Sequence, residues 1–112
     1  MRVYYNKKSI DIPVRKVGFF GKYIGLMFKS KETRNLLFDF NKDLRRGIHS
    51  YFVFFPFLAI WLDNKNRVLE SKIVYPFTSL VLPKCDFRKL VEIPRNHGNS
   101  NLIVFFVGKR KI

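Results

Sequence analysis

The chain has 112 residues, of which 47% are hydrophobic and 17% aromatic. This apolar content excludes a disordered chain, and the length predicts a single domain over residues 1–112. The chain carries 22 Lys and Arg but only 8 Asp and Glu, a formal net charge of +14. Such a charge favours polyanionic partners such as RNA, DNA or anionic lipid head groups, unless it reflects no more than a lysine-rich background.

Nothing near Met1 resembles a secretory signal, because the first residues contain no continuous apolar run and no small-residue cleavage site. The sequence therefore predicts a cytoplasmic protein. Cys85 is the only cysteine, so no intramolecular disulfide can form. This agrees with a reducing compartment.

Two β-rich runs around a polar turn at Asn6–Ser9 predict a hairpin at the start of the chain. Apolar residues spaced by three and four positions then predict a short helix over 17–27, weakened by Gly18 and Gly21. The alternation of Leu36, Phe38 and Phe40 predicts a strand.

The stretch IHSYFVFFPFLAIWLD, residues 48–63, is the most apolar part of the chain. It is shorter than the about 20 residues that a membrane helix needs, and Pro56 interrupts it, so we expect no membrane span. Its Phe, Val, Ile, Tyr and Trp are typical of buried strands. The sequence predicts a central pair of core strands here, with Pro56 at a bulge, an edge or a break.

A three-residue turn at Asn64–Asn66 predicts a second hairpin. A short strand over 89–93, a loop over 94–101 and a last strand over 102–107 complete the chain. The predicted fold is mainly β (α+β): a mostly antiparallel sheet closed into a small β-barrel or folded sandwich, with one short helix.

Five stretches in order carry a family resemblance: GLMFK (25–29), NLLFDF (35–40), IHSYFVFFPFLAIWLD (48–63), RVLESKIVYPFTS (67–79) and LVEIPRN (90–96). They resemble the domain of unknown function 192 family, in particular its short archaeal-type branch. The resemblance implies a compact β-rich, barrel-like domain and no reaction. Leu58 stands where the family usually has an acidic residue, and Gly98, Asn99 and Ser100 stand where it usually has a glycine-aspartate pair.

Catalytic patterns are absent from the sequence. His49 and His97 lie far apart, Cys85 is alone and the carboxylates are scattered, so we expect no metal, no cofactor and no catalytic residue. His49 is either a structural histidine at the start of a buried strand or a polar group lining a pocket. An enzyme remains a third class of function behind two kinds of binding module.

Binding is the function that the sequence favours, in one of two forms. The first is a polyanion-binding module for RNA or DNA, which would give salt-dependent phosphate contacts. Its candidate residues are Lys16, Lys22, Arg45, Arg46, Lys109, Arg110 and Lys111. The alternative is a small-molecule site at one end of a barrel, with His49, Ser50 and Pro56 as candidate pocket residues.

Overall fold

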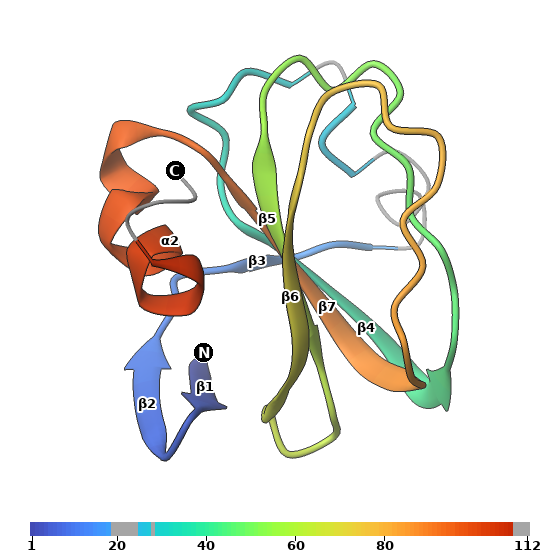
Figure 1. Cartoon of the computed structure of the whole chain (residues 1–112), viewed down its shortest axis with the longest axis vertical. Coiled ribbons are helices and arrows are strands. Elements are labelled where there is room, and N and C mark those ends of the chain that lie inside the picture. The colour runs from blue at the N-terminus through green and yellow to red at the C-terminus, as the bar shows by residue number, and fades with distance from the viewer. Residues whose placement is uncertain (19–24, 28, 109–112) are drawn as a thin grey trace.

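A five-stranded sheet forms the centre of the protein, whose computed structural model describes residues 1–18, 25–27 and 29–108. The strand order is β3-β4-β7-β5-β6 (Figure 1). The strands are β3 (Arg15–Lys16), β4 (Leu36–Leu44), β7 (Phe87–Pro94), β5 (Phe57–Leu62) and β6 (Val68–Val74). β3 runs parallel to β4, and the other pairs are antiparallel.

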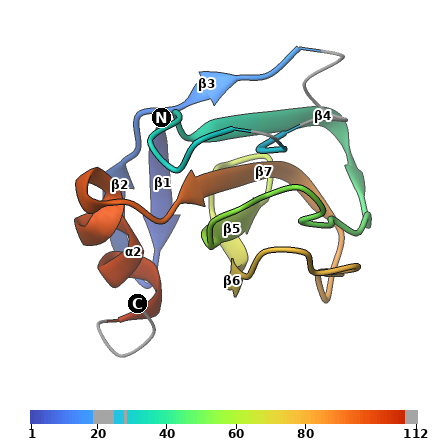
Figure 2. The same ribbon diagram turned by 90° about the horizontal axis from the view of Figure 1, so that it is seen from above.

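The predicted mainly β class is confirmed, but the sheet is open. Its edge strands β3 and β6 do not pair with each other among the described residues, so the predicted closure into a barrel does not occur. Figure 2 shows the five strands side by side from β3 to β6, with the helix and the N-terminal hairpin on one side of them.

Both predicted hairpins are confirmed. β1 (Arg2–Tyr5) and β2 (Lys8–Asp11) form a separate two-stranded sheet, and both turn residues between them have positive φ. A two-residue turn of this kind matches the twist of the flanking strands. In the β5–β6 turn, the Asp63 carboxylate accepts hydrogen bonds from the backbone of two residues that follow it.

Alternation in β5 creates two cores. Phe57, Ala59 and Trp61 face one side of the sheet, where they pack beneath the segment 48–55. The intervening residues of β5 face the other side, which the β1–β2 hairpin and the C-terminal helix cover (Figures 1 and 2). All six residues of β5 are buried, so the prediction of a buried core strand is confirmed for this half of the stretch 48–63.

The prediction of a last strand over 102–107 is wrong. A 3-10 turn, η1 (His97–Asn99), leads into the helix α2 (Ser100–Val107). A continuous apolar run does not distinguish a strand from a buried helix. Here Ile103 and Phe106, three residues apart, are buried together against the sheet, which is the spacing of one helix face.

The predicted helix over 17–27 lies mostly outside the described residues, and its described end, Gly25–Met27, forms a turn. The prediction that residues 48–56 form a strand of the central pair is also wrong. Val53, Phe55 and Phe57 alternate inward as in a strand. However, β4 and β5 occupy both sides of β7, so residues 48–56 cannot pair with β7 in the centre of the sheet. In the described part of the chain, no helix is long and apolar enough to cross a membrane.

Candidate ligand pocket

A pocket of about 160 Å³ lies between the sheet and the segment that follows β4. Its walls are mainly apolar and come from β4, β5, β7, the turn at Gly25–Met27 and residues 45–56 between β4 and β5, which we call the covering segment. The lining residues are Gly25, Leu26, Met27, Phe38, Phe40, Arg46, Gly47, Ile48, His49, Val53, Phe57, Phe87, Leu90 and Glu92. Most pockets that bind small molecules are apolar with a few polar groups, and this one has three charged or titratable side chains.

Glu92 is the buried polar group of the pocket. It lies in β7, with Leu36 of β4 on one side and Ala59 of β5 on the other. Only 6% of the residue is exposed, and its carboxyl group accepts no hydrogen bond from any described residue. Burial raises the pKa of Glu92 to about 8, because the charged carboxylate has lost its water without gaining a partner.

Gly25 approaches the Glu92 carboxyl closely. Its φ of +52° lies in the left-handed region, which glycine adopts without strain. A Cβ atom at this position would lie 3.3 Å from Glu92 Oε1 and 3.4 Å from the ring of Phe38. The glycine therefore keeps space open in front of the carboxyl group.

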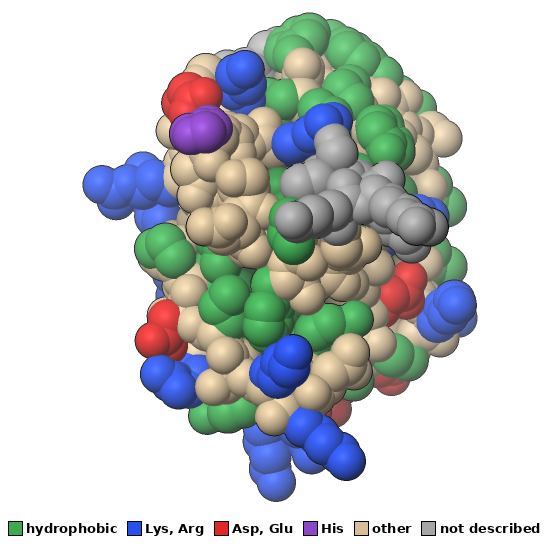
Figure 3. All heavy atoms as spheres, turned by 60° about the vertical axis from the view of Figure 1, so that its left-hand side comes forward, with side chains coloured by type: hydrophobic (Ala, Val, Ile, Leu, Met, Phe, Trp, Pro, Cys, Tyr) green, Lys and Arg blue, Asp and Glu red, His purple; other side chains and the backbone are tan. Residues whose placement is uncertain are grey.

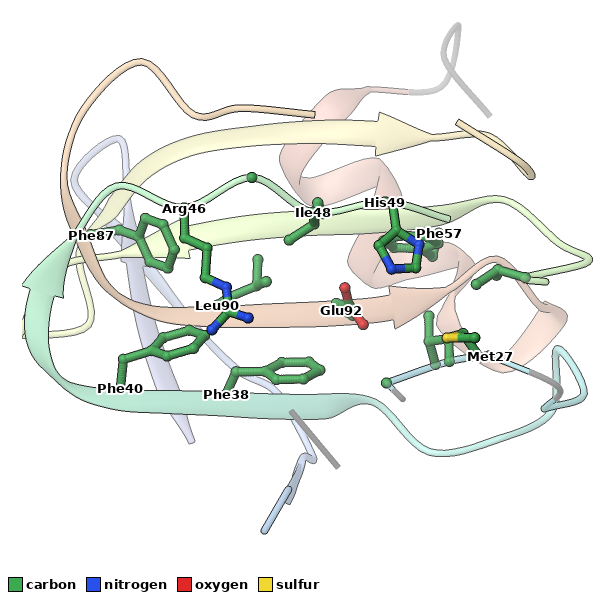
Figure 4. Close-up of a pocket in the computed structure, with 14 residues that line it drawn as sticks. Met27, Phe38, Phe40, Arg46, Ile48, His49, Phe57, Phe87, Leu90 and Glu92 are labelled. Atoms are coloured by element: carbon green, nitrogen blue, oxygen red, sulfur yellow. The ribbon is translucent and has the colours of Figure 1, made fainter. Parts of the chain in front are cut away.

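Arg46 and His49 extend toward the pocket from the covering segment, as Figure 4 shows, while Glu92 points into the same space from β7. The Nδ1 atom of His49 accepts a hydrogen bond of 3.2 Å from the backbone of Tyr51, which leaves Nε2 as its other polar atom. Arg46 has no side-chain hydrogen bond or ion pair with a described residue. The three groups can thus bind a ligand's polar atoms.

The three predicted pocket residues lie in different surroundings. His49 lines the pocket, but Ser50 and Pro56 do not. Ser50 is completely buried, and its hydroxyl donates to Tyr75 O and accepts from Thr78 N, which ties the covering segment to the chain after β6. Pro56 precedes β5, and its carbonyl accepts a hydrogen bond from the backbone of Arg95. No strand ends just before it in the described chain, so it marks the start of β5 and not the predicted break between two strands.

Of the candidate polyanion-binding residues, the structure describes three, and it does not bring Lys16 together with Arg45 and Arg46. Lys16 lies on β3, beside the start of β4, whereas Arg45 and Arg46 follow the end of β4, a nine-residue strand. Arg45 donates a hydrogen bond of 2.9 Å to the backbone of Pro83. Lys22, Lys109, Arg110 and Lys111 lie outside the described residues.

On the face that carries α2 and the β1–β2 hairpin, the described Lys and Arg residues form no single basic patch. Figure 3 shows its Lys and Arg side chains standing apart, with uncharged and hydrophobic surface between them. No group of three or more His, Cys, Asp or Glu among the described residues could hold a metal ion.

The comparisons with known proteins bear on the fold. No family model matches the chain, and no curated protein matches it. A "putative transcription regulator" from Sinorhizobium meliloti 1021 has a similar structure, with a TM-score of 0.77 and 13% identity, over 94% of this chain and 84% of the other. A protein of unknown function from Novosphingobium aromaticivorans DSM 12444 has a TM-score of 0.64 and 14% identity, over 86% of this chain and 70% of the other. At these identities the likeness shows the fold alone.

Sequence reasoning missed Glu92 and Gly25 as pocket residues. A signal for Glu92 was present, because Leu90 and Glu92 lie two apart in a short strand and therefore share a face. A carboxylate on the buried face of a strand is rare unless it is paired. No comparable signal marked Gly25, whose role depends on its distance from a residue far along the chain.

Proposed function

We propose that the protein is a small-ligand-binding module, and that its ligand occupies the pocket in front of Glu92. The observation that carries this proposal is a buried carboxyl group, without a described hydrogen-bond partner, that faces a cavity of about 160 Å³. An unpaired buried polar group costs folding free energy, so a ligand that hydrogen-bonds to it would recover part of that cost.

The size and lining of the pocket restrict the ligand. An apolar cavity of about 150 Å³ can hold a molecule of the size of benzene. Phe38, Phe57 and Phe87 offer flat apolar walls, and Glu92 supplies a polar end. The ligand is therefore a small molecule with an apolar or aromatic body and one polar group that meets Glu92.

The test measures binding of four compounds of this size: benzylamine, benzamidine, benzyl alcohol and benzoate. Binding is detected by changes in amide chemical shifts in nuclear magnetic resonance spectra. We expect at least one compound to shift the amides of residues around Glu92, and Glu92→Gln to weaken its binding about tenfold or more. Glu32→Gln, which changes an exposed glutamate, is the matched control. If none of the compounds shifts these amides, or if both variants bind alike, the proposal is wrong.

The titration of Glu92 distinguishes between kinds of ligand. Below a pKa of about 8 the carboxyl group is protonated and can donate a hydrogen bond to a neutral ligand. Above it the carboxylate attracts a cation. Affinity for benzylamine or benzamidine should therefore rise as the pH passes from 7 to 9, whereas affinity for benzyl alcohol should fall.

A second candidate function is binding of a polyanion, specifically nucleic acid. The net charge of +14 favours it, since Lys and Arg on a protein surface replace the counterions of a phosphate backbone. The Sinorhizobium meliloti protein of similar fold is described as a "putative transcription regulator", and only its fold is shared with this chain.

We also propose that the chain is a member of the domain of unknown function 192 family, on the strength of the five ordered stretches. These stretches overlap β4, β5, β6 and β7 and include Gly25, Phe38, His49 and Glu92 of the pocket. If the proposal is right, members of that family should keep a pocket at this place in the sheet.

A further inference from the structure

A cluster of exposed aromatic rings lies outside the pocket, on the covering segment and the chain after β6. Phe54 is 61% exposed and Phe77 is 50% exposed. Their ring centroids lie 5.5 Å apart with the planes at 68°, and the ring of Phe52 lies 6.1 Å from that of Phe77. Contiguous apolar surface of this kind usually marks an interaction site.

The backbone holds these rings outward. Phe52 and Phe77 have φ of +59° and +58°, a conformation that is unfavourable for a bulky side chain. Hydrogen bonds stabilise it at Phe77: its N–H donates to Ser50 O, and the next residue donates to the buried Ser50 hydroxyl. Strained backbone that fixed neighbours support is typical of functional sites.

A hollow of about 600 Å³ adjoins Phe54. It contains the side chains of Lys31, Arg95 and His97, together with Asn96 and Ser100, and no acidic residue is among its described lining. The hollow that contains Lys16 includes Glu32, and the one beside the β1–β2 hairpin includes Glu70. The hollow at Phe54 therefore combines exposed aromatic surface with the two exposed cationic side chains of Lys31 and Arg95.

Single-stranded nucleic acid fits this combination best. Its bases are free to stack on aromatic rings, and its phosphates pair with nearby cations. A second copy of the chain fits poorly, because two molecules of net charge +14 repel each other. A duplex fits poorly too, because its base faces are already stacked inside the helix.

We propose that single-stranded nucleic acid binds across this surface, with bases on Phe54 and Phe77 and phosphates beside Lys31 and Arg95. The proposal rests on the second candidate function above, nucleic-acid binding, and places it at residues that the sequence did not single out. It is independent of the pocket at Glu92, which a base-stacking surface does not need.

The test uses fluorescence anisotropy of labelled oligo-dT, oligo-U and a duplex of equal length at about 50 and 200 mM salt. Phe54→Ala with Phe77→Ala should weaken binding to the single strands about 5- to 100-fold, because each stacked base contributes that order of affinity. Tyr4→Ala, at an exposed ring on β1, is the matched control and should change affinity less than twofold. Phe54→Tyr keeps a ring and should restore binding.

The contribution of Lys31 to phosphate binding is tested by the same anisotropy measurements. Lys31→Gln should reduce the slope of log affinity against log salt by about 0.7, the value expected for one phosphate contact on a single strand. Lys65→Gln, which removes one exposed lysine from the β5–β6 turn, should leave the slope unchanged.

The outcomes separate this proposal from the broader one. If no nucleic acid binds at 50 mM salt, both proposals are wrong. If the single strands bind but the paired Phe substitutions have no more effect than Tyr4→Ala, then nucleic acid does not bind at Phe54 and Phe77. The second candidate function would still stand. Duplex binding as tight as single-strand binding would also contradict the proposal that bases stack on Phe54 and Phe77. Circular dichroism spectra and thermal midpoints of the variants establish that they are folded.

Discussion

Gly25 determines the space in front of Glu92, so it is the residue at which pocket shape and stability can be tested together. Gly25→Ala would place a side chain in a left-handed backbone conformation and against the carboxyl group. We expect the free energy of unfolding to fall by about 1–2 kcal/mol, as measured by urea denaturation. Gly18→Ala is the control, because its Cβ would meet no atom within 4 Å. Equal effects of the two substitutions would contradict this role of Gly25.

Glu92 should make the stability of the protein depend on pH. Burial raises its pKa from the usual 4.5 to about 8, so between these values the folded protein holds a proton that the unfolded chain releases. The free energy of unfolding should therefore fall as the pH rises from about 4.5 to about 8. Glu92→Gln removes this dependence, and above pH 8 it should be more stable than the wild type by at most about 5 kcal/mol.

Urea denaturation at pH 5, 7 and 9 measures this difference. Glu32→Gln serves as the control for loss of one exposed carboxylate. A difference between Glu92→Gln and wild type that is constant across this range would show that Glu92 is not held protonated by burial.

At the scale of single residues, the sequence predicted some of the pocket for physical reasons that can be named. His49 was recognised because a polar group precedes an apolar run, whereas Arg46 was predicted to bind a polyanion and lines the pocket instead. Ser50 does not line this pocket, and the sequence does not reveal that its hydroxyl binds Tyr75 and Thr78, some 25 and 28 residues away. Contacts between distant segments decide such roles.

At the scale of elements, a buried pair of asparagines joins α2 to the sheet. Asn99 Nδ2 donates to Asn35 Oδ1 at 3.0 Å and to Pro94 O at 2.8 Å, and Asn35 Nδ2 donates to Pro13 O at 2.9 Å. The pair thus links the N-terminal segment, the start of β4, the end of β7 and the helix. Each side chain satisfies polar groups that would otherwise be buried without partners.

Asn99→Ala should lower the free energy of unfolding by about 1–3 kcal/mol, because it leaves the Asn35 side-chain oxygen and the Pro94 carbonyl unsatisfied. Asn35→Ala should have a similar cost. Because the two residues share a hydrogen bond, the double variant should lose less than the sum of the single losses. Chemical denaturation of all four proteins measures this coupling, and strictly additive losses would show that the pair does not act as a unit.

The elements that the sequence predicted correctly are those with a local signal. Turn residues specified both hairpins, the alternation of Leu36, Phe38 and Phe40 specified β4, and a run of aromatic and β-branched residues specified β5. The errors concern apolar runs, residues 48–56 and 102–107, where period and length do not decide between strand, loop and helix. The rest of the sheet determines the structure of these runs. β4 and β5 pair with the two sides of β7, so neither run can pair with β7.

At the scale of the whole molecule, the two faces of the sheet differ in what covers them. The pocket opens on one face, beneath the covering segment, and the opposite face is closed by the β1–β2 hairpin and α2. Net charge could be read from the sequence, but its distribution could not, because Lys16 and Arg45 are separated by the length of β4. The positive charge is therefore expected to affect the stability of the whole molecule as well as binding at any one site.

The excess of positive charge should make the folded state sensitive to salt. Among the described residues, three ion pairs link Arg and Asp side chains, and each includes a well-exposed partner, so each contributes little. Repulsion among the remaining cations disfavours the compact state, and added ions screen it. We expect the thermal midpoint to rise by a few degrees between 10 and 300 mM sodium chloride, as measured by circular dichroism. A series in sucrose of equal osmolality controls for effects of solute other than screening. A midpoint that falls with salt would mean that attractive pairs outweigh repulsion, and would remove the self-repulsion on which the argument against a second copy at Phe54 and Phe77 depends.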